Sequence, residues 1–129
     1  MLELQNATSA DLVSYLSGTV PDENDADCIT WALKRLGAER YVPAIPVLAK
    51  LLDFRRPPNE FEKKGISIHP SGTSDLYPAA GALELIGEKV LPTMLDVIKS
   101  ESMSKTARDN AVAVLMEIHK YKKRRELLF

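Results

Sequence analysis

Apolar residues recur along this chain at intervals of three and four residues, which places them on one face of an α-helix. No stretch alternates apolar and polar residues with a period of two, so we expect no β-strand. The pattern predicts a first helix that follows a cap at Thr8 or Ser9 and stops at Gly18. It also predicts helices over about residues 24–37, 41–54, 74–86 and 88–99, a helix from Ser102 or Ser104 to about His119, and a short last helix over 121–129. We therefore expect residues 1–129 to form a single all-α domain.

Capping and turn residues mark the ends of these helices. Residues 8–11, Thr-Ser-Ala-Asp, have the form of a capping box, in which a hydroxyl and a carboxylate satisfy the first backbone N–H groups of a helix. Gly18 is placed to end that helix. Gly37 and Gly87 are each predicted to end a helix in the left-handed conformation, which glycine adopts without steric cost.

Residues 55–73 break the helical pattern, because prolines and glycines interrupt them. A loop of roughly 20 residues is uncommon in a compact domain and is often functional. Its basic and aromatic side chains can bind phosphate or an acidic peptide, so we expect part of the partner surface here. The candidate partner-binding residues are Arg55, Arg56, Phe61, Lys63, Lys64 and His69. The alternative is a solvated spacer whose Phe61 and Ile66 pack against the helices.

An internal repeat is the strongest signal in the sequence. The segment 32–37, Ala-Leu-Lys-Arg-Leu-Gly, matches the segment 82–87, Ala-Leu-Glu-Leu-Ile-Gly, and 114–119 is a weaker third copy. The second and third copies begin 32 residues apart, at 82 and 114, whereas the first two, at 32 and 82, begin 50 apart. Removing the irregular loop brings the two spacings into line. Pro43 and Pro92 follow the first two glycines inside a second apolar helix.

This A-L-x-x-[LI]-G turn before a proline-initiated helix resembles HEAT repeats and the HEAT-like repeats of small bacterial proteins, over about residues 26–120. The third copy departs from the pattern, because His119 replaces the glycine and no proline follows. The resemblance implies a short right-handed α-α superhelix, a HEAT/armadillo-like solenoid of about three helical hairpins with a long inserted loop. It implies partner binding on the inner face or through inserted loops, and carries no catalytic residues. A four-helix bundle is the alternative architecture.

Composition narrows the class of protein. Hydrophobic residues make up 45% and charged residues 27%, as in ordinary globular proteins. No apolar run reaches the roughly 20 residues that a membrane-spanning helix needs. Residues 1–10 hold no basic residue and no apolar signal-peptide core. We therefore expect a cytoplasmic protein without membrane contact, and the single cysteine, Cys28, excludes an internal disulfide framework.

The net charge of −1 is unevenly distributed along the chain. Residues 1–27 contain six acidic residues and no Lys or Arg, whereas residues 120–129 contain five basic residues and one acidic residue. This asymmetry can steer a partner or favour head-to-tail contact between copies. Helix dipoles offer a simpler explanation, since they favour acids near helix starts and bases near helix ends.

The sequence contains no catalytic constellation. His69 and His119 lack a ligand set, Cys28 lies on an apolar face, and no spacing supports a nucleophilic Cys–His pair. The acidic segment 22–27 lacks a third oxygen ligand and the glycine of a calcium loop. Trp31 lies beside the main apolar face, where it borders the core or forms an exposed anchor. We expect no catalytic residue, no metal and no cofactor.

These observations favour a non-enzymatic protein–protein interaction module or scaffold, whose partner the sequence does not identify. Self-association into a homo-dimer is compatible with the exposed ends of a short solenoid. A nucleic-acid-binding HEAT-like protein is one alternative, and a HEAT-like lyase-type enzyme with a polar pocket is another. The nucleic-acid alternative requires a common face for Lys34, Arg35, Arg40, Arg55, Arg56 and Arg108.

Overall fold

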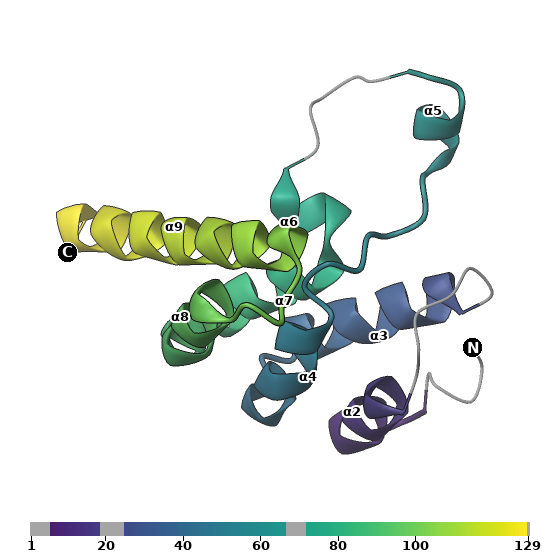
Figure 1. The fold of residues 1–129 in the computed structure, drawn as a ribbon, viewed down its shortest axis with the longest axis horizontal. Helices are drawn as coiled ribbons and strands as arrows, with labels where there is room; N and C mark the ends of the chain where they lie inside the picture. Colours follow the sequence, from purple (N-terminus) through teal and green to yellow (C-terminus); the bar gives the residue numbers. More distant parts are fainter. Residues whose placement is uncertain (1–5, 19–24, 67–71, 129) are drawn as a thin grey trace.

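A computed structural model of the chain describes residues 6–18, 25–66 and 72–128 (Figure 1). Every regular element in these ranges is helical, which confirms the all-α class. The elements are α2 (Ser9–Ser17), α3 (Ala26–Ala38), η1 (Val42–Ala44), α4 (Ile45–Lys50), α5 (Glu60–Lys63), α6 (Thr73–Leu76), α7 (Pro78–Ile86), η2 (Glu88–Val90), α8 (Leu91–Lys99) and α9 (Lys105–Leu128). None of these helices combines the length and the apolar character needed to cross a membrane.

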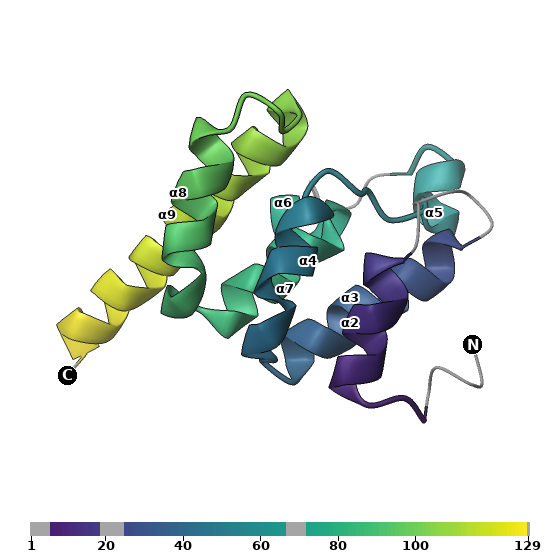
Figure 2. The ribbon, with the colours of Figure 1, turned by 60° about the horizontal axis from the view of Figure 1, so that its bottom comes forward.

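The helices form two rows that run from one end of the molecule to the other. In one row α3 packs against α7, and α7 packs against α9; in the other row α4 packs against α8. The helix α2 covers α3 and α4 at one end, and the α8–α9 hairpin forms the other end (Figure 2). The most extensive helix pair is α3 with α7, which carry the first two copies of the sequence repeat.

The predicted capping box begins α2. The Thr8 Oγ1 accepts a hydrogen bond from the Asp11 backbone N–H at 3.1 Å, and the Asp11 Oδ2 accepts one from the Thr8 N–H at 3.1 Å. The hydrogen bond from the Thr8 backbone N–H is the main cause that lowers the pKa of the Asp11 carboxyl, because it stabilises the charged form. The helix buries Leu12 and Leu16 and gives way to Gly18. The prediction for this helix is confirmed.

The prediction for Gly37 is wrong, and the prediction for Gly87 is confirmed. Gly87 follows α7 with φ 90°, a conformation that glycine favours. Gly37 instead lies inside α3 and is buried against α7. A Cβ added to Gly37 would lie 2.6 Å from the Ala82 Cα. Gly37 therefore serves close helix packing, and the left-handed residue after α3 is Arg40, with φ 51°.

The helices α4 and α8 each begin with a tight turn. A 3₁₀ turn, η1 or η2, leads directly into α4 or α8, and the second residue of that α-helix is Pro46 or Pro92. The structure therefore pairs Pro92 with Pro46, whereas the sequence repeat had paired it with Pro43. The helix predicted over 41–54 is also shorter, because α4 ends at Lys50.

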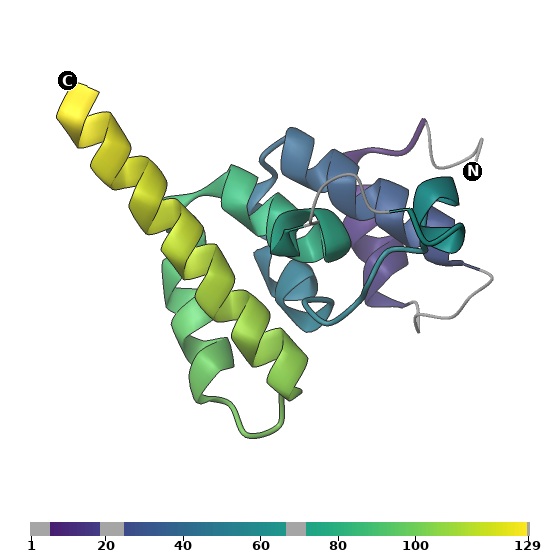
Figure 3. The ribbon, with the colours of Figure 1, turned by 90° about the horizontal axis from the view of Figure 1, so that it is seen from above.

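The helix α9 replaces two predicted helices. It runs without interruption to Leu128, because no glycine or proline follows His119. Its last turns extend away from the other helices (Figure 3). Ser104 caps its start, since the Ser104 Oγ accepts a hydrogen bond from the Ala107 N–H at 3.0 Å.

Two polar contacts fix α9 to the end of α4. The Ser104 hydroxyl donates to the Asp53 Oδ2 at 2.8 Å. The buried Asn110 donates from its Nδ2 to the Leu52 carbonyl oxygen at 2.7 Å. This bond satisfies a backbone carbonyl in the turn that follows α4.

The core is built from apolar side chains of α2, α3, α4, α7, α8 and α9. In α8 Met94 and Val97 are buried, whereas Leu95 is 47% exposed. The side chains Leu12, Ile29, Leu33, Leu36, Leu48, Leu52, Leu83, Met94, Val90 and Val114 are the largest that are fully buried.

We expect Gly37→Ala to destabilise the protein by about 1–2 kcal/mol net in urea unfolding. The alanine gains helix propensity, but its Cβ forces α3 and α7 apart, and the second effect is larger. Gly18→Ala is the matched control, because its Cβ meets nothing closer than the Ser14 carbonyl oxygen at 3.8 Å. Equal stability of the two variants would contradict the packing role of Gly37.

Candidate functional site

Arg56, one of the six predicted loop residues, is occupied by contacts within the chain. Its side chain is only 9% exposed. Its Nη1 donates to the Glu62 Oε1 at 2.7 Å and its Nη2 to the Asp75 Oδ2 at 2.8 Å. Its Nε donates to the Asp75 carbonyl oxygen at 3.1 Å, and its backbone N–H donates to the Leu76 carbonyl oxygen at 3.0 Å. Arg56 thus joins the start of the loop to α5 and α6.

The carboxylate of Glu62 supports this junction. The hydrogen bond from Arg56, followed by the one from the Asn59 N–H, lowers the pKa of Glu62. Asn59 in turn caps α5, since its Oδ1 accepts from the Glu62 N–H at 2.8 Å. The junction is therefore a closed set of satisfied donors and acceptors, which has no free guanidinium to offer a partner.

The other predicted loop residues have different surroundings. Arg55, Phe61 and Lys64 are exposed, and the Lys63 Nζ lies 3.8 Å from the Glu60 Oε1. His69 lies outside the described residues. Phe61 and Ile66, which the spacer alternative places against the helices, are 57% and 48% exposed. A partner role for the exposed loop residues stays a prediction.

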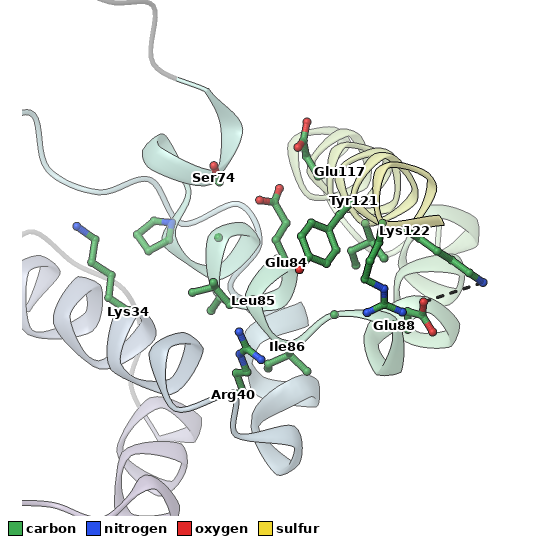
Figure 4. A pocket seen from close by; sticks show the side chains of 16 residues that line it. Lys34, Arg40, Ser74, Glu84, Leu85, Ile86, Glu88, Glu117, Tyr121 and Lys122 are labelled. Atoms are coloured by element: carbon green, nitrogen blue, oxygen red, sulfur yellow. Dashed lines mark ion pairs between the residues drawn. The ribbon is translucent and has the colours of Figure 1, made fainter. Parts of the chain in front are cut away.

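A pocket of about 750 Å³ lies on the row of helices formed by α3, α7 and α9 (Figure 4). The helix α7 is its floor, with Leu85 and Glu84. One wall carries Lys34 and the turn residue Arg40, and the other carries the last turns of α9. We call this pocket the α7 groove. None of its residues was among the predicted partner-binding residues.

The wall formed by α9 follows from helical periodicity. Ala111, Val114 and Ile118 face the core at intervals of three and four residues. The same stripe continues to Tyr121 and Arg125, beyond the point where other helices cover it. Tyr121 is 66% exposed as a result. One face of the basic segment 120–125 therefore lines the groove. The sequence indicates this face only if residues 105–128 are taken as one continuous helix.

Arg40 enters the groove wall through an unusual backbone conformation. Its N–H donates to the Gly37 carbonyl oxygen at 3.0 Å, and the Tyr41 N–H donates to the Leu36 carbonyl oxygen at 3.1 Å. This is a Schellman motif, in which glycine normally occupies the left-handed position. An arginine there, with φ 51°, costs about 1 kcal/mol relative to a relaxed conformation.

The positive charges of the groove have few partners. The Lys122 Nζ lies 4.0 Å from the Glu88 Oε1. Lys34, Arg40 and Arg125 have no carboxylate partner among residues 6–18, 25–66 and 72–128. These three cations come from both walls, so a ligand in the groove would meet positive charge on two sides.

Glu84 has the most perturbed carboxyl of the groove. Figure 4 shows Glu84 and Tyr121 pointing into the space between α7 and α9. Burial of the half-buried side chain, followed by the negative charge of Glu117, raises the pKa of Glu84 to about 7. Its carboxyl has no hydrogen-bond partner in the part of the chain that the structure describes. Glu117 itself lies 3.3 Å from the Lys120 Nζ.

The remaining candidates from the sequence lie elsewhere. Of the six bases required for a nucleic-acid face, only Lys34 and Arg40 line the groove, and Arg35 stacks on Trp31 at 5.5 Å from the ring centroid. Trp31 packs against the core, as one of its two alternatives proposed. Cys28 is half-buried rather than part of the core. Across the described ranges no three His, Cys, Asp or Glu residues gather in a way that could hold a metal ion.

Comparisons of this chain with protein-family models, with curated proteins and with solved structures find no match.

We expect Glu84→Gln to flatten the pH dependence of stability between pH 5 and 8. The folded-state pKa of Glu84 is raised from 4.5 to about 7. The stability that the protonated carboxyl contributes is therefore fully present below pH 4.5 and is lost as the pH rises through 7. At pH 8 the free energy of unfolding of the variant should exceed that of the parent by about 1–2 kcal/mol. This range allows for solvent screening of a half-buried group. Urea unfolding at several pH values measures this, with the exposed Glu101→Gln as control. A parallel pH dependence in parent and variant would contradict it.

Proposed function

We propose that this chain is a non-enzymatic protein-interaction module of the HEAT-like type, and that it binds a segment of a partner protein in the α7 groove. The successive helices α3–α4 and α7–α8 support a solenoid, because they share the sequence repeat, the opening 3₁₀ turn and the proline at the second helical position. The helix α9 carries the third copy and packs next to α7.

The observation that carries the proposal is the groove itself. Its floor exposes Leu85, which is 51% accessible, and its wall exposes Tyr121. Aromatic and aliphatic side chains inside a concave, charged surface are typical of sites that hold side chains of a partner. A volume of about 750 Å³ is enough for a few side chains of a peptide segment.

The contiguous row of helices also favours a partner over a small substrate. The groove lies over α7 between two longer helices, α3 and α9. An extended or helical segment can lie along such a surface and place successive side chains on it. Homo-dimer formation is a special case, in which the segment comes from a second copy.

A photo-crosslinking experiment in cells of the source organism tests the proposal. Tyr121→benzoylphenylalanine places the reactive group in the groove, and Met116→benzoylphenylalanine places it on the outer face of the same helix, where Met116 is 56% exposed. We expect a discrete protein adduct from position 121 and none from position 116, identified by mass spectrometry. The same substitution at Phe61 tests the loop. Adducts from position 116 or 61 without one from 121 would contradict a groove-centred function.

A further inference from the structure

We infer that the α7 groove recognises an acidic segment of the partner, in which a carboxylate pairs with Arg40 or Arg125 and a neighbouring apolar side chain packs on Leu85 and Tyr121. The inference rests on the proposed function and adds the chemical class of the segment that the groove binds.

The balance of free charges supports an anionic ligand. Three cations of the groove, Lys34, Arg40 and Arg125, lack a carboxylate partner within the described parts of the chain. Two of the three lining carboxylates already have cations nearby, since Glu88 faces Lys122 and Glu117 faces Lys120. Arginine suits this role, because its planar guanidinium can hold a carboxylate through two parallel hydrogen bonds.

The conformation of Arg40 is the second, independent observation. Glycine is the residue that the left-handed position of a Schellman motif favours, and Arg40 holds it against a steric cost. An unfavourable backbone conformation at the edge of a groove motivates a functional role for the side chain that it presents. Here that side chain is a free guanidinium at the groove wall (Figure 4).

The mixed lining favours a peptide over a nucleic acid. A nucleic acid carries a phosphate at every nucleotide, so its backbone would meet Glu84, Glu88 and Glu117 as it followed the groove. A peptide can place one acidic residue against Arg40 or Arg125 and an apolar residue on the floor. Its backbone N–H can also donate to the unpartnered carboxyl of Glu84.

Neighbouring arginines of α9 provide a matched pair of variants. Arg125 lines the groove, whereas Arg124 precedes it on the same helix and does not. Arg125→Glu and Arg124→Glu therefore make the same change in net charge at almost the same place. Arg40→Gly removes the other guanidinium and relieves its backbone conformation, so this variant should unfold at the same or a higher urea concentration.

The probe is a fluorescent peptide of about ten residues in which Glu alternates with Leu, long enough to span the groove when extended. The comparison probes are the same peptide with Gln for Glu, and a labelled single-stranded oligothymidine. Fluorescence anisotropy at low and moderate salt measures their affinities for the full chain. We expect binding of the Glu–Leu peptide that weakens with salt and exceeds that of the Gln–Leu peptide by about tenfold.

We also expect Arg40→Gly and Arg125→Glu each to weaken binding of the Glu–Leu peptide by about tenfold, and Arg124→Glu by less than about twofold. Absent binding, equal affinity for the two peptides, equal losses in the two charge reversals, or preference for the oligothymidine would each overturn the inference. A protein adduct at position 121 together with any of those results would leave the proposed function standing and remove only the acidic specificity.

Discussion

The close approach of α3 and α7 at Gly37 is the constraint on which the rest of the structure depends. With no side chain at this position, the two helices can pack until the Ala82 backbone lies against Gly37. That contact brings the end of α3 beside α7, and the turn that follows places Arg40 at the edge of the groove. A larger residue at position 37 would change the geometry of the core and of the groove together, because both use the same helix pair.

Several helix ends could be predicted from the sequence, because each of them has a local cause. The capping box at Thr8, the stop at Gly87 and the cap at Ser104 all act through the backbone of their own helix. The two repeated segments that begin at Ala32 and Ala82 lie on α3 and α7, which pack against each other. The predictions that failed depend on contacts between distant segments. Gly37 and Gly87 both end an A-L-x-x-[LI]-G segment, and that shared pattern does not indicate that Gly37 packs against Ala82 of α7 whereas Gly87 ends a helix.

The groove could not be predicted from local patterns for the same reason. The sequence does contain a signal for the wall formed by α9, since Tyr121 and Arg125 continue the buried stripe of that helix beyond Ile118. The sequence, however, predicts a helix that ends at His119 and a separate short helix over 121–129, and this division interrupts the stripe. The other wall depends on the left-handed backbone conformation of Arg40. The residue usually expected at such a position is glycine. Glu84 lies on an apolar helix, and its raised pKa arises from burial and from a residue on α9.

The junction made by Arg56 separates the inserted loop from the row of helices. Because its backbone and guanidinium bind Leu76 and Asp75, the two ends of the insertion are held together before α7 begins. The chain that leaves at Arg56 returns to nearly the same point, so the spacing of α4 and α7 does not depend on what lies between. The entropy of closing such a loop changes by only about 0.6 kcal/mol for each doubling of its length. The insertion is therefore a site where the chain can be lengthened, shortened or exchanged with little effect on the stability of the helices.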